Sequence, residues 1–197
     1  GTDRLDQKKS VLKGTPDTSW FDYKNPKKQY QITSEEQLMG LASLVNEEQA
    51  SRWKPTRTET FEGVTFKLTK DIKLTGEWTP IGMSESICFA GSFDGNGHKI
   101  SGINSNGTQT KLFDDIYVSE IKNLEIECKE KEDGRGLGVY LADSTIDSKF
   151  TNCSITGNRI EIDGYCSAMI REAYASEFIH CINNADIIYN NDTQIVA

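Results

Sequence analysis

A repeat of about 28 residues is the sequence feature that most constrains how this chain folds. Three segments of the second half align with one another: IKNLEI from Ile121, FTNCSI from Phe150 and FIHCIN from Phe178. Their first positions lie 29 and 28 residues apart, and their fourth positions, Leu124, Cys153 and Cys181, keep the same spacing. A fixed period of this length is typical of a solenoid, in which each repeat forms one coil.

The repeat extends to other parts of the chain. An apolar pair ends eight residues before each aligned segment, as Leu112-Phe113, Leu141-Ala142 and Met169-Ile170. Nearer the N-terminus, two patterns return after 28 residues: Phe61-Glu62-Gly63 as Phe89-Ala90-Gly91, and Ile72 as Ile100. The pattern fails at Asn183, where Ile126 and Ile155 predict an apolar residue.

Each repeat has the pattern of short strands joined by tight turns. Between residues 61 and 82 apolar and polar residues alternate, and the apolar set is Val64, Phe66, Leu68, Ile72 and Leu74. This period of two is typical of strands, and the Gly, Asn and Asp residues of FDGNGHKISG and SGINSNG favour turns. The sequence therefore predicts an all-β chain whose coils each add one strand to several parallel sheets, with equivalent residues ~4.8 Å apart.

Stacked coils would place equivalent side chains in rows along one hydrophobic interior. Two rows are predicted, Ile121/Phe150/Phe178 and Leu124/Cys153/Cys181. We expect the two cysteines to stay thiols, because parallel side chains in register point the same way. The chain has five cysteines without a C-x-x-C motif and only two histidines, His98 and His180, so a four-ligand zinc site is not expected.

An amphipathic helix over about 33–46 is predicted to cover the N-terminal end of the solenoid. Thr33 or Ser34 would be its N-cap, and Thr33 with Glu36 has the spacing of a capping box. Its apolar stripe has the i, i+3, i+4, i+7 spacing and consists of Leu38, Leu41, Ala42 and Val45. The C-terminal sequence IIYNNDTQIVA offers no matching cap, so we expect that end to pair, to form an oligomer or to continue into further chain.

Composition restricts the organisation and the partners. The chain has 197 residues and a formal net charge of −8, which argues against nucleic-acid binding because phosphate contacts need clustered Lys and Arg. No apolar stretch approaches the ~18 residues of a membrane span. We expect a polar leader at 1–17, which would follow a removed export signal or lipid anchor, and a single β-helix domain at 18–197.

The order of motifs resembles that of the β-helix domains with GLUG-type repeats of surface and secreted proteins from gut and other anaerobic bacteria. The resemblance runs from about Thr18 to Asn184, and its most specific parts are WTPIG (Trp78–Gly82) and FAGSFDGNGHKISGI (Phe89–Ile103). It implies a right-handed, single-stranded parallel β-helix of the pectin-lyase-like kind with an N-terminal capping α-helix. Most such domains have no assigned activity and look structural or adhesive. The family's Gly-Leu-Phe-Gly motif is degenerate here, where Leu112 and Phe113 stay and both glycines are replaced.

Several residues are candidates for metal binding or catalysis. Asp94 and Asn96 of FDGNGH could offer oxygens to Ca²⁺, but Asp-Gly and Asn-Gly are foremost turn formers. Asp114 and Asp115 could form the carboxylate pair of a glycosidase, yet neighbouring strand residues point to opposite faces, so a solvated turn is the favoured interpretation. A lyase base could be Lys111 or Arg171, without a recognisable metal partner. We therefore predict no catalytic, cofactor or metal site.

Aromatic residues could stack on sugar rings. The candidates are Trp20, Trp53, Trp78, Tyr117, Tyr140, Tyr165 and Tyr189. Trp78 is interpreted as structural. Trp53, in the polar segment ASRWKPTR, is the weak candidate for ligand binding, and packing in the core or the cap is the favoured interpretation of these aromatic residues.

The sequence predicts a non-catalytic module, extracellular or anchored at the bacterial cell surface. Its role would be adhesive or structural, with a glycan or a host or surface protein as partner and with no cofactor. The alternatives are a β-helix polysaccharide lyase or glycoside hydrolase, and an oligomeric spacer.

Overall fold

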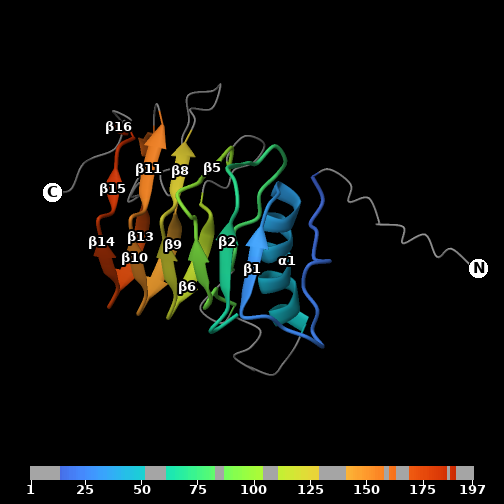
Figure 1. Ribbon diagram of the computed structural model, residues 1–197. Helices are drawn as coiled ribbons and strands as arrows, with labels where there is room; N and C mark the ends of the chain where they lie inside the picture. The colour runs from blue at the N-terminus through green and yellow to red at the C-terminus, as the bar shows by residue number, and fades with distance from the viewer. Residues whose placement is uncertain are drawn as a thin grey trace, which may run out of the picture.

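Short parallel strands wind along one axis, with a single helix at the N-terminal end (Figure 1). The computed structural model describes residues 14–51, 61–82, 87–103, 111–128, 141–157, 160–162, 169–185 and 187–189, and for 47–51, 160–162 and 187–189 the backbone alone. The helix of this described part is α1 (Glu35–Ser51). Its strands are β1 (Gln29–Ile32), β2 (Thr65–Leu68), β3 (Ile72–Lys73), β4 (Ser92–Asp94), β5 (Lys99–Ser101), β6 (Phe113–Tyr117), β7 (Glu120–Lys122), β8 (Glu125–Cys128), β9 (Ala142–Ile146), β10 (Lys149–Thr151), β11 (Ser154–Gly157), β12 (Ile160–Ile162), β13 (Ile170–Tyr174), β14 (Glu177–Ile179), β15 (Ile182–Asn183) and β16 (Ile187–Tyr189).

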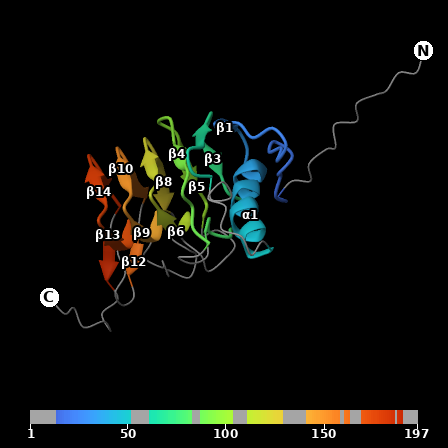
Figure 2. The same cartoon turned by 90° about the horizontal axis from the view of Figure 1, so that it is seen from below.

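The strands stack into three main sheets. A six-stranded sheet has the order β1-β2-β4-β7-β10-β14, a five-stranded sheet β15-β11-β8-β5-β3 and a three-stranded sheet β13-β9-β6, while β12 and β16 form a separate pair. Three coils, β6-β7-β8, β9-β10-β11 and β13-β14-β15, have a strand in every main sheet, and Figure 2 shows β6, β9 and β13 in a layer apart from β10 and β14. The predicted parallel β-solenoid with an N-terminal helix is confirmed, with about three complete turns.

Rows of like side chains fill the interior. The longest row contains one residue from each strand of the six-stranded sheet: Tyr30, Phe66, Phe93, Ile121, Phe150 and Phe178. All but Phe178 are buried, and the rings of Phe150 and Phe178 stack with centroids 4.9 Å apart and planes 7° from parallel. The predicted row Ile121/Phe150/Phe178 is therefore confirmed. The row Leu124/Cys153/Cys181 is confirmed as well, because the strands next to Cys153 pair with residues 29 positions earlier and 28 positions later in the chain.

One predicted equivalence near the N-terminus is wrong. Ile72 pairs with Ile100 as expected, but β2 and β4 pair with an offset of 27, Phe66 opposite Phe93. Phe61 and Phe89 are therefore not equivalent: Phe61 lies in a turn with φ of 62°, and Phe89 forms a bridge to Ile116. The turn between β4 and β5 (residues 95–98) accounts for the change, because it has one residue more than the turn between β2 and β3 (residues 69–71).

The turns are stacked as regularly as the strands. Asn96, Asn123, Asn152 and His180 have positive φ of 51° to 53° at one corner of successive coils. Asn152 Nδ2 donates to Asn123 Oδ1 at 3.1 Å, and Asn123 Nδ2 donates to Asp94 Oδ1 at 3.4 Å. Asn tolerates the left-handed region better than most residues and its amide both donates and accepts, so one residue type meets both needs.

Serines occupy a second corner. Ser119, Ser148 and Ser176 follow residues with positive φ, and the Oγ of each of the last two accepts a bond from the backbone N–H of the serine one coil earlier, at 3.1 and 3.2 Å. Ser119 in turn donates to the Gly91 carbonyl. These bonds satisfy backbone groups that the bend leaves outside the strand ladders.

The helix covers the first coil as predicted, with corrections at both ends. The apolar stripe of the helix is buried against the core; it consists of Leu38, Leu41, Ala42 and Val45.

The N-cap of the helix is Ser34, whose Oγ accepts a hydrogen bond from Gln37 N–H at 3.2 Å. The side-chain oxygen of Gln37 in turn accepts from Thr33 N–H at 2.7 Å. The expected Thr33–Glu36 box is not formed, because Glu36 accepts from Gly14 N–H instead. The helix begins at Glu35 and ends at Ser51, beyond the predicted residue 46.

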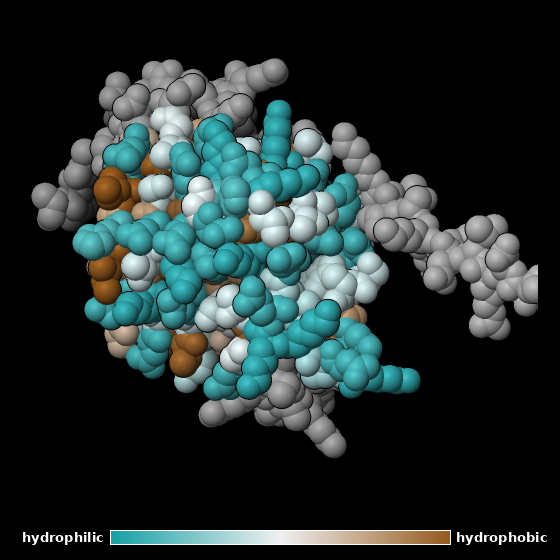
Figure 3. Space-filling model, in the orientation of Figure 1, coloured by the Kyte–Doolittle hydropathy of each residue, from teal (hydrophilic) through white to brown (hydrophobic). Residues whose placement is uncertain are grey.

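The opposite end of the solenoid is open in the described residues. β13, β14 and β15 are the last strands of their sheets, and Phe178 and Ile182 are 41% and 53% exposed. Figure 3 shows hydrophobic side chains gathered at this end, whereas the face toward the viewer is mostly hydrophilic.

Replacing Phe150 with alanine should lower the free energy of unfolding by about 3–5 kcal/mol, because a fully buried ring in the longest row is lost. The same change at Phe178, which among the described residues has a row neighbour, Phe150, on one side only, should cost less than half as much. Urea unfolding followed by circular dichroism measures both. Equal losses at the two positions would show that stacking does not hold the coils together.

Candidate functional site

Charged, polar and aromatic side chains gather on the outer face of the three-stranded sheet β6-β9-β13. Strand register places them in three rows along the solenoid axis. The charged row is Asp114, Asp143 and Arg171; the polar row is Asp115, Ser144 and Glu172; the aromatic row is Tyr117, Ile146 and Tyr174. We call these nine residues the three-row face.

Asp114 and Asp115 lie on the same side of β6. Phe113 and Ile116 are both buried, so the two residues between them stay outside the core and both aspartates are half-buried. The prediction that they point to opposite faces is therefore wrong, and so is the prediction of a solvated turn, because both belong to a strand. The strict alternation fails because buried positions on β6 and β9 are three residues apart.

The charged row is a network of ion pairs. Arg171 contacts both oxygens of Asp143 at 2.8 and 2.9 Å. Lys111 Nζ lies 2.9 Å from Asp114 and 3.6 Å from Asp143. The hydrogen bond from Arg171, with help from the Lys111 charge, holds the pKa of Asp143 below its ordinary value.

Both residues that the sequence offers as a lyase base, Lys111 and Arg171, belong to this network. Lys111 and Arg171 share Asp143, and Arg171 also contacts Glu172 at 2.6 Å. The charges join coils to one another, because Lys111, Asp143 and Arg171 come from three successive repeats. The role that the geometry supports for this row is structural.

The aromatic row is exposed and lies beside a cleft. Tyr117 and Tyr174 are 46% and 59% exposed, and Ile146 between them is half-buried. The cleft has a volume of about 210 Å³ and is lined by Cys88, Asp115, Ile116, Tyr117, Ser144 and Ile146. Burial raises the pKa of Cys88, which keeps its thiol protonated. Ring faces next to carboxylate and hydroxyl groups are the combination that binds sugars.

The FDGNGH segment is a turn. Asp94 Oδ1 accepts from Asn96 N–H at 2.8 Å, and Asn96 and Gly97 both have positive φ. Gly95 is required, since a Cβ there would lie 2.4 Å from the Asn123 carbonyl oxygen of the next coil. Among the described residues no three His, Cys, Asp or Glu side chains gather as metal ligands.

The histidines have separate surroundings. His98 Nδ1 lies 3.2 Å from Asp71, whereas His180 belongs to the positive-φ corner row. The structure does not bring either of them to the three-row face.

Stacked thiols provide the other reactive groups. Cys153 is buried and Cys181 is half-buried one coil later; both are free thiols, as expected. The hydrogen bond between the two thiols raises the pKa of Cys153 and lowers the pKa of Cys181. Their Sγ atoms also lie 3.5 Å from the carbonyls of Ile121 and Phe150, so both thiols face the interior.

The tryptophans in the described residues are structural. Trp78 is buried and its Nε1 donates to the Lys111 carbonyl at 3.0 Å, which confirms the prediction. Trp20 packs edge-on against Tyr30 and Phe66. Four candidates lie outside the described side chains: Trp53, Tyr140, Tyr165 and Tyr189.

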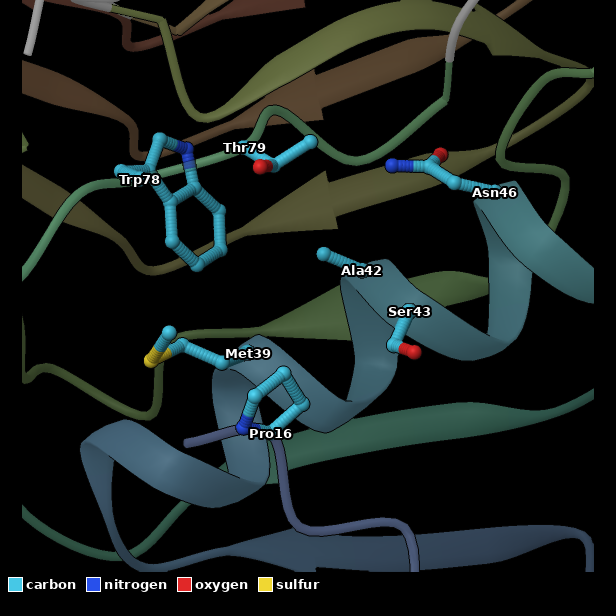
Figure 4. A pocket seen from close by; sticks show the side chains of 7 residues that line it. All are labelled: Pro16, Met39, Ala42, Ser43, Asn46, Trp78 and Thr79. Atoms are coloured by element: carbon cyan, nitrogen blue, oxygen red, sulfur yellow. The ribbon is translucent and has the colours of Figure 1, made fainter. Parts of the chain in front are cut away.

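A second pocket lies between α1 and the segment after β3 (Figure 4). Its volume is about 250 Å³, and it is lined by Pro16, Met39, Ala42, Ser43, Asn46, Trp78 and Thr79. Asn46 is already used there: its amide donates to the Pro80 carbonyl and its oxygen accepts from Gly82 N–H, both at 2.8 Å. The pocket therefore lies where the helix packs against the first coil, and no charged residue lines it.

Sequence reasoning missed most of the three-row face. It named Tyr117 among the aromatic candidates but not Tyr174, because the repeats were aligned on their buried positions only. A signal was present: Tyr117, Ile146 and Tyr174 each lie four residues before the first position of an aligned segment.

Comparison with known proteins adds no relative: no family model, no curated protein and no solved structure matches the chain. Within the described residues, none of the helical structure has the length and apolar character needed to cross a membrane.

Replacing Asp143 with asparagine should destabilise the protein at pH 7 and have no effect in strong acid. The folded-state pKa of Asp143 lies below its ordinary value of 3.8, so the ionised group stabilises the fold above pH ~4. That contribution is lost as the pH falls through the folded-state pKa. Urea unfolding of wild type and variant between pH 7 and 2.5 measures the difference, with Glu62→Gln as a charge-matched surface control. A difference independent of pH would contradict the ion-pair assignment.

Proposed function

We propose that this chain is a non-catalytic β-solenoid module of a secreted or surface-anchored bacterial protein, of the GLUG-type kind, and that it binds glycans on its three-row face. The observation that carries the proposal is the register of that face. Exposed tyrosines recur in line with one another, next to a row of carboxylate and hydroxyl groups. Adhesion to host or dietary glycans is the role that such a surface suits.

The chemistry of the face matches a sugar. A pyranose ring has an apolar face, which stacks on an aromatic ring, and hydroxyl groups at its edge, which bond to carboxylates. Tyr117 and Tyr174 supply the rings, and Asp115, Ser144 and Glu172 supply the polar groups. The strands hold these side chains in place before a ligand arrives, which lowers the entropic cost of binding.

The non-catalytic part of the proposal rests on the charged row. Lys111 and Asp114 are paired with each other, and Arg171 is paired with Asp143. A lyase or hydrolase needs a base or acid pair directed at the substrate. A reducing-sugar assay on mixed polysaccharides tests the enzymatic alternative, and sustained release of reducing ends would replace the proposed function.

Replacing Tyr117 or Tyr174 with alanine should weaken glycan binding by about tenfold each, because each change removes one stacking platform. Binding is measured by a glycan array and then by isothermal titration calorimetry on the glycans that bind. Tyr23→Ala is the matched control, since Tyr23 is 48% exposed and lies in the segment before β1.

Two results would overturn this proposal. One is the absence of binding to every glycan tested. The other is equal weakening by the Tyr23 variant, which would place the binding surface elsewhere.

A further inference from the structure

We infer that the ligand is a neutral, extended β-1,4-linked polysaccharide that lies parallel to the solenoid axis, with one sugar over each coil. This inference rests on the proposed function and names its ligand class. It follows from the spacing of the aromatic row, the place of the polar row and the charge of the face.

The spacing comes from the strands. Tyr117, Ile146 and Tyr174 are in-register residues of three adjacent parallel strands. Neighbouring strands are ~4.8 Å apart, so the two tyrosines lie about 10 Å apart along the axis. In an extended β-1,4-linked chain each sugar is turned over relative to the one before, and the two-sugar repeat has nearly this length. Sugars one and three would therefore present the same ring face to Tyr117 and Tyr174.

The polar row provides the second contact. Asp115, Ser144 and Glu172 run beside the aromatic row, one per coil, with the same register. A flat β-1,4-linked chain has equatorial hydroxyl groups along its edges at one interval per sugar. Ring faces and hydroxyls would thus meet their partners in every coil. A helical α-1,4-linked chain curves away from a straight row and loses this match after one sugar.

Charge decides between neutral and acidic polysaccharides. Asp114, Asp115, Asp143 and Glu172 place four carboxylates on the face and its border, against the two cations Lys111 and Arg171. Both cations are bound to carboxylates within the network. A uronic-acid polymer would bring further negative charge to this surface and be repelled, so the face favours a neutral chain.

The experiment compares hexasaccharides on the whole protein by isothermal titration calorimetry. The neutral β-1,4-linked probes are cellohexaose, xylohexaose and mannohexaose; maltohexaose tests the linkage, and hexagalacturonate tests the charge. At least one neutral β-1,4 probe should bind about tenfold more tightly than either comparison probe. For that probe, affinity should rise from the disaccharide to the trisaccharide, which is the shortest ligand that reaches both tyrosines.

Variants test the alignment along the axis. Tyr174→Ala should reduce the affinity for the hexasaccharide to the affinity that the wild-type protein has for the disaccharide, because only Tyr117 remains as a stacking platform. Ile146→Tyr completes the aromatic row and should tighten hexasaccharide binding by about threefold. Lys149→Tyr adds an exposed ring on β10, outside the three-row face; it is the matched control and should have little effect.

The outcomes separate this inference from the function on which it rests. Binding of no glycan at all would end both. Binding of maltohexaose or hexagalacturonate as tightly as the β-1,4 probes, or affinity that does not depend on chain length, would overturn the axial ligand and leave glycan binding in place.

Discussion

In-register contact between like residues of successive coils is the interaction on which the whole molecule depends. Phe66, Phe93, Ile121 and Phe150 are buried in one continuous row because the coils on either side supply similar side chains, whereas Tyr30, at the end of the row, packs against Phe66 on one side and against Trp20 and Phe21. No coil could bury its apolar residues alone. The same contact aligns the corners and the outer faces, so that equivalent surface residues of successive coils also lie in register.

The corners show how this constraint reaches the backbone. At the first corner an asparagine or histidine adopts positive φ in successive coils, and the Asn152–Asn123 amide bond links two of them. At the second, serine hydroxyls accept backbone N–H groups from the coil before. Because each bend repeats, a hydrogen bond that pairs a polar group of one coil with the next coil also fixes the position of that next coil. The in-register rows on the face of β6, β9 and β13 follow from this regularity.

Sequence reasoning recovered the fold because a period is a property of the sequence itself. The 28- and 29-residue spacings of Phe150 and its equivalents are the strand register. It failed where the period is local: β2 and β4 pair with an offset of 27, and β6 departs from strict alternation at Asp114 and Asp115. Most of the candidate site was not predicted, because its members are ordinary polar and aromatic residues that form a surface row only once the coils align them.

The two ends of the solenoid differ, and this asymmetry bears on how such a protein changes in size. The helix α1 lies at one end, whereas at the other β14 and β15 are the last strands of their sheets in the part of the chain that the structure describes, and Phe178 is 41% exposed. Duplication of one repeat near that open end would lengthen the rod by a single strand spacing while leaving every existing contact intact. In a protein built in this way the helix-capped end stays constant, and evolution can change the length of the solenoid, and of any surface row, by whole repeats at the other end.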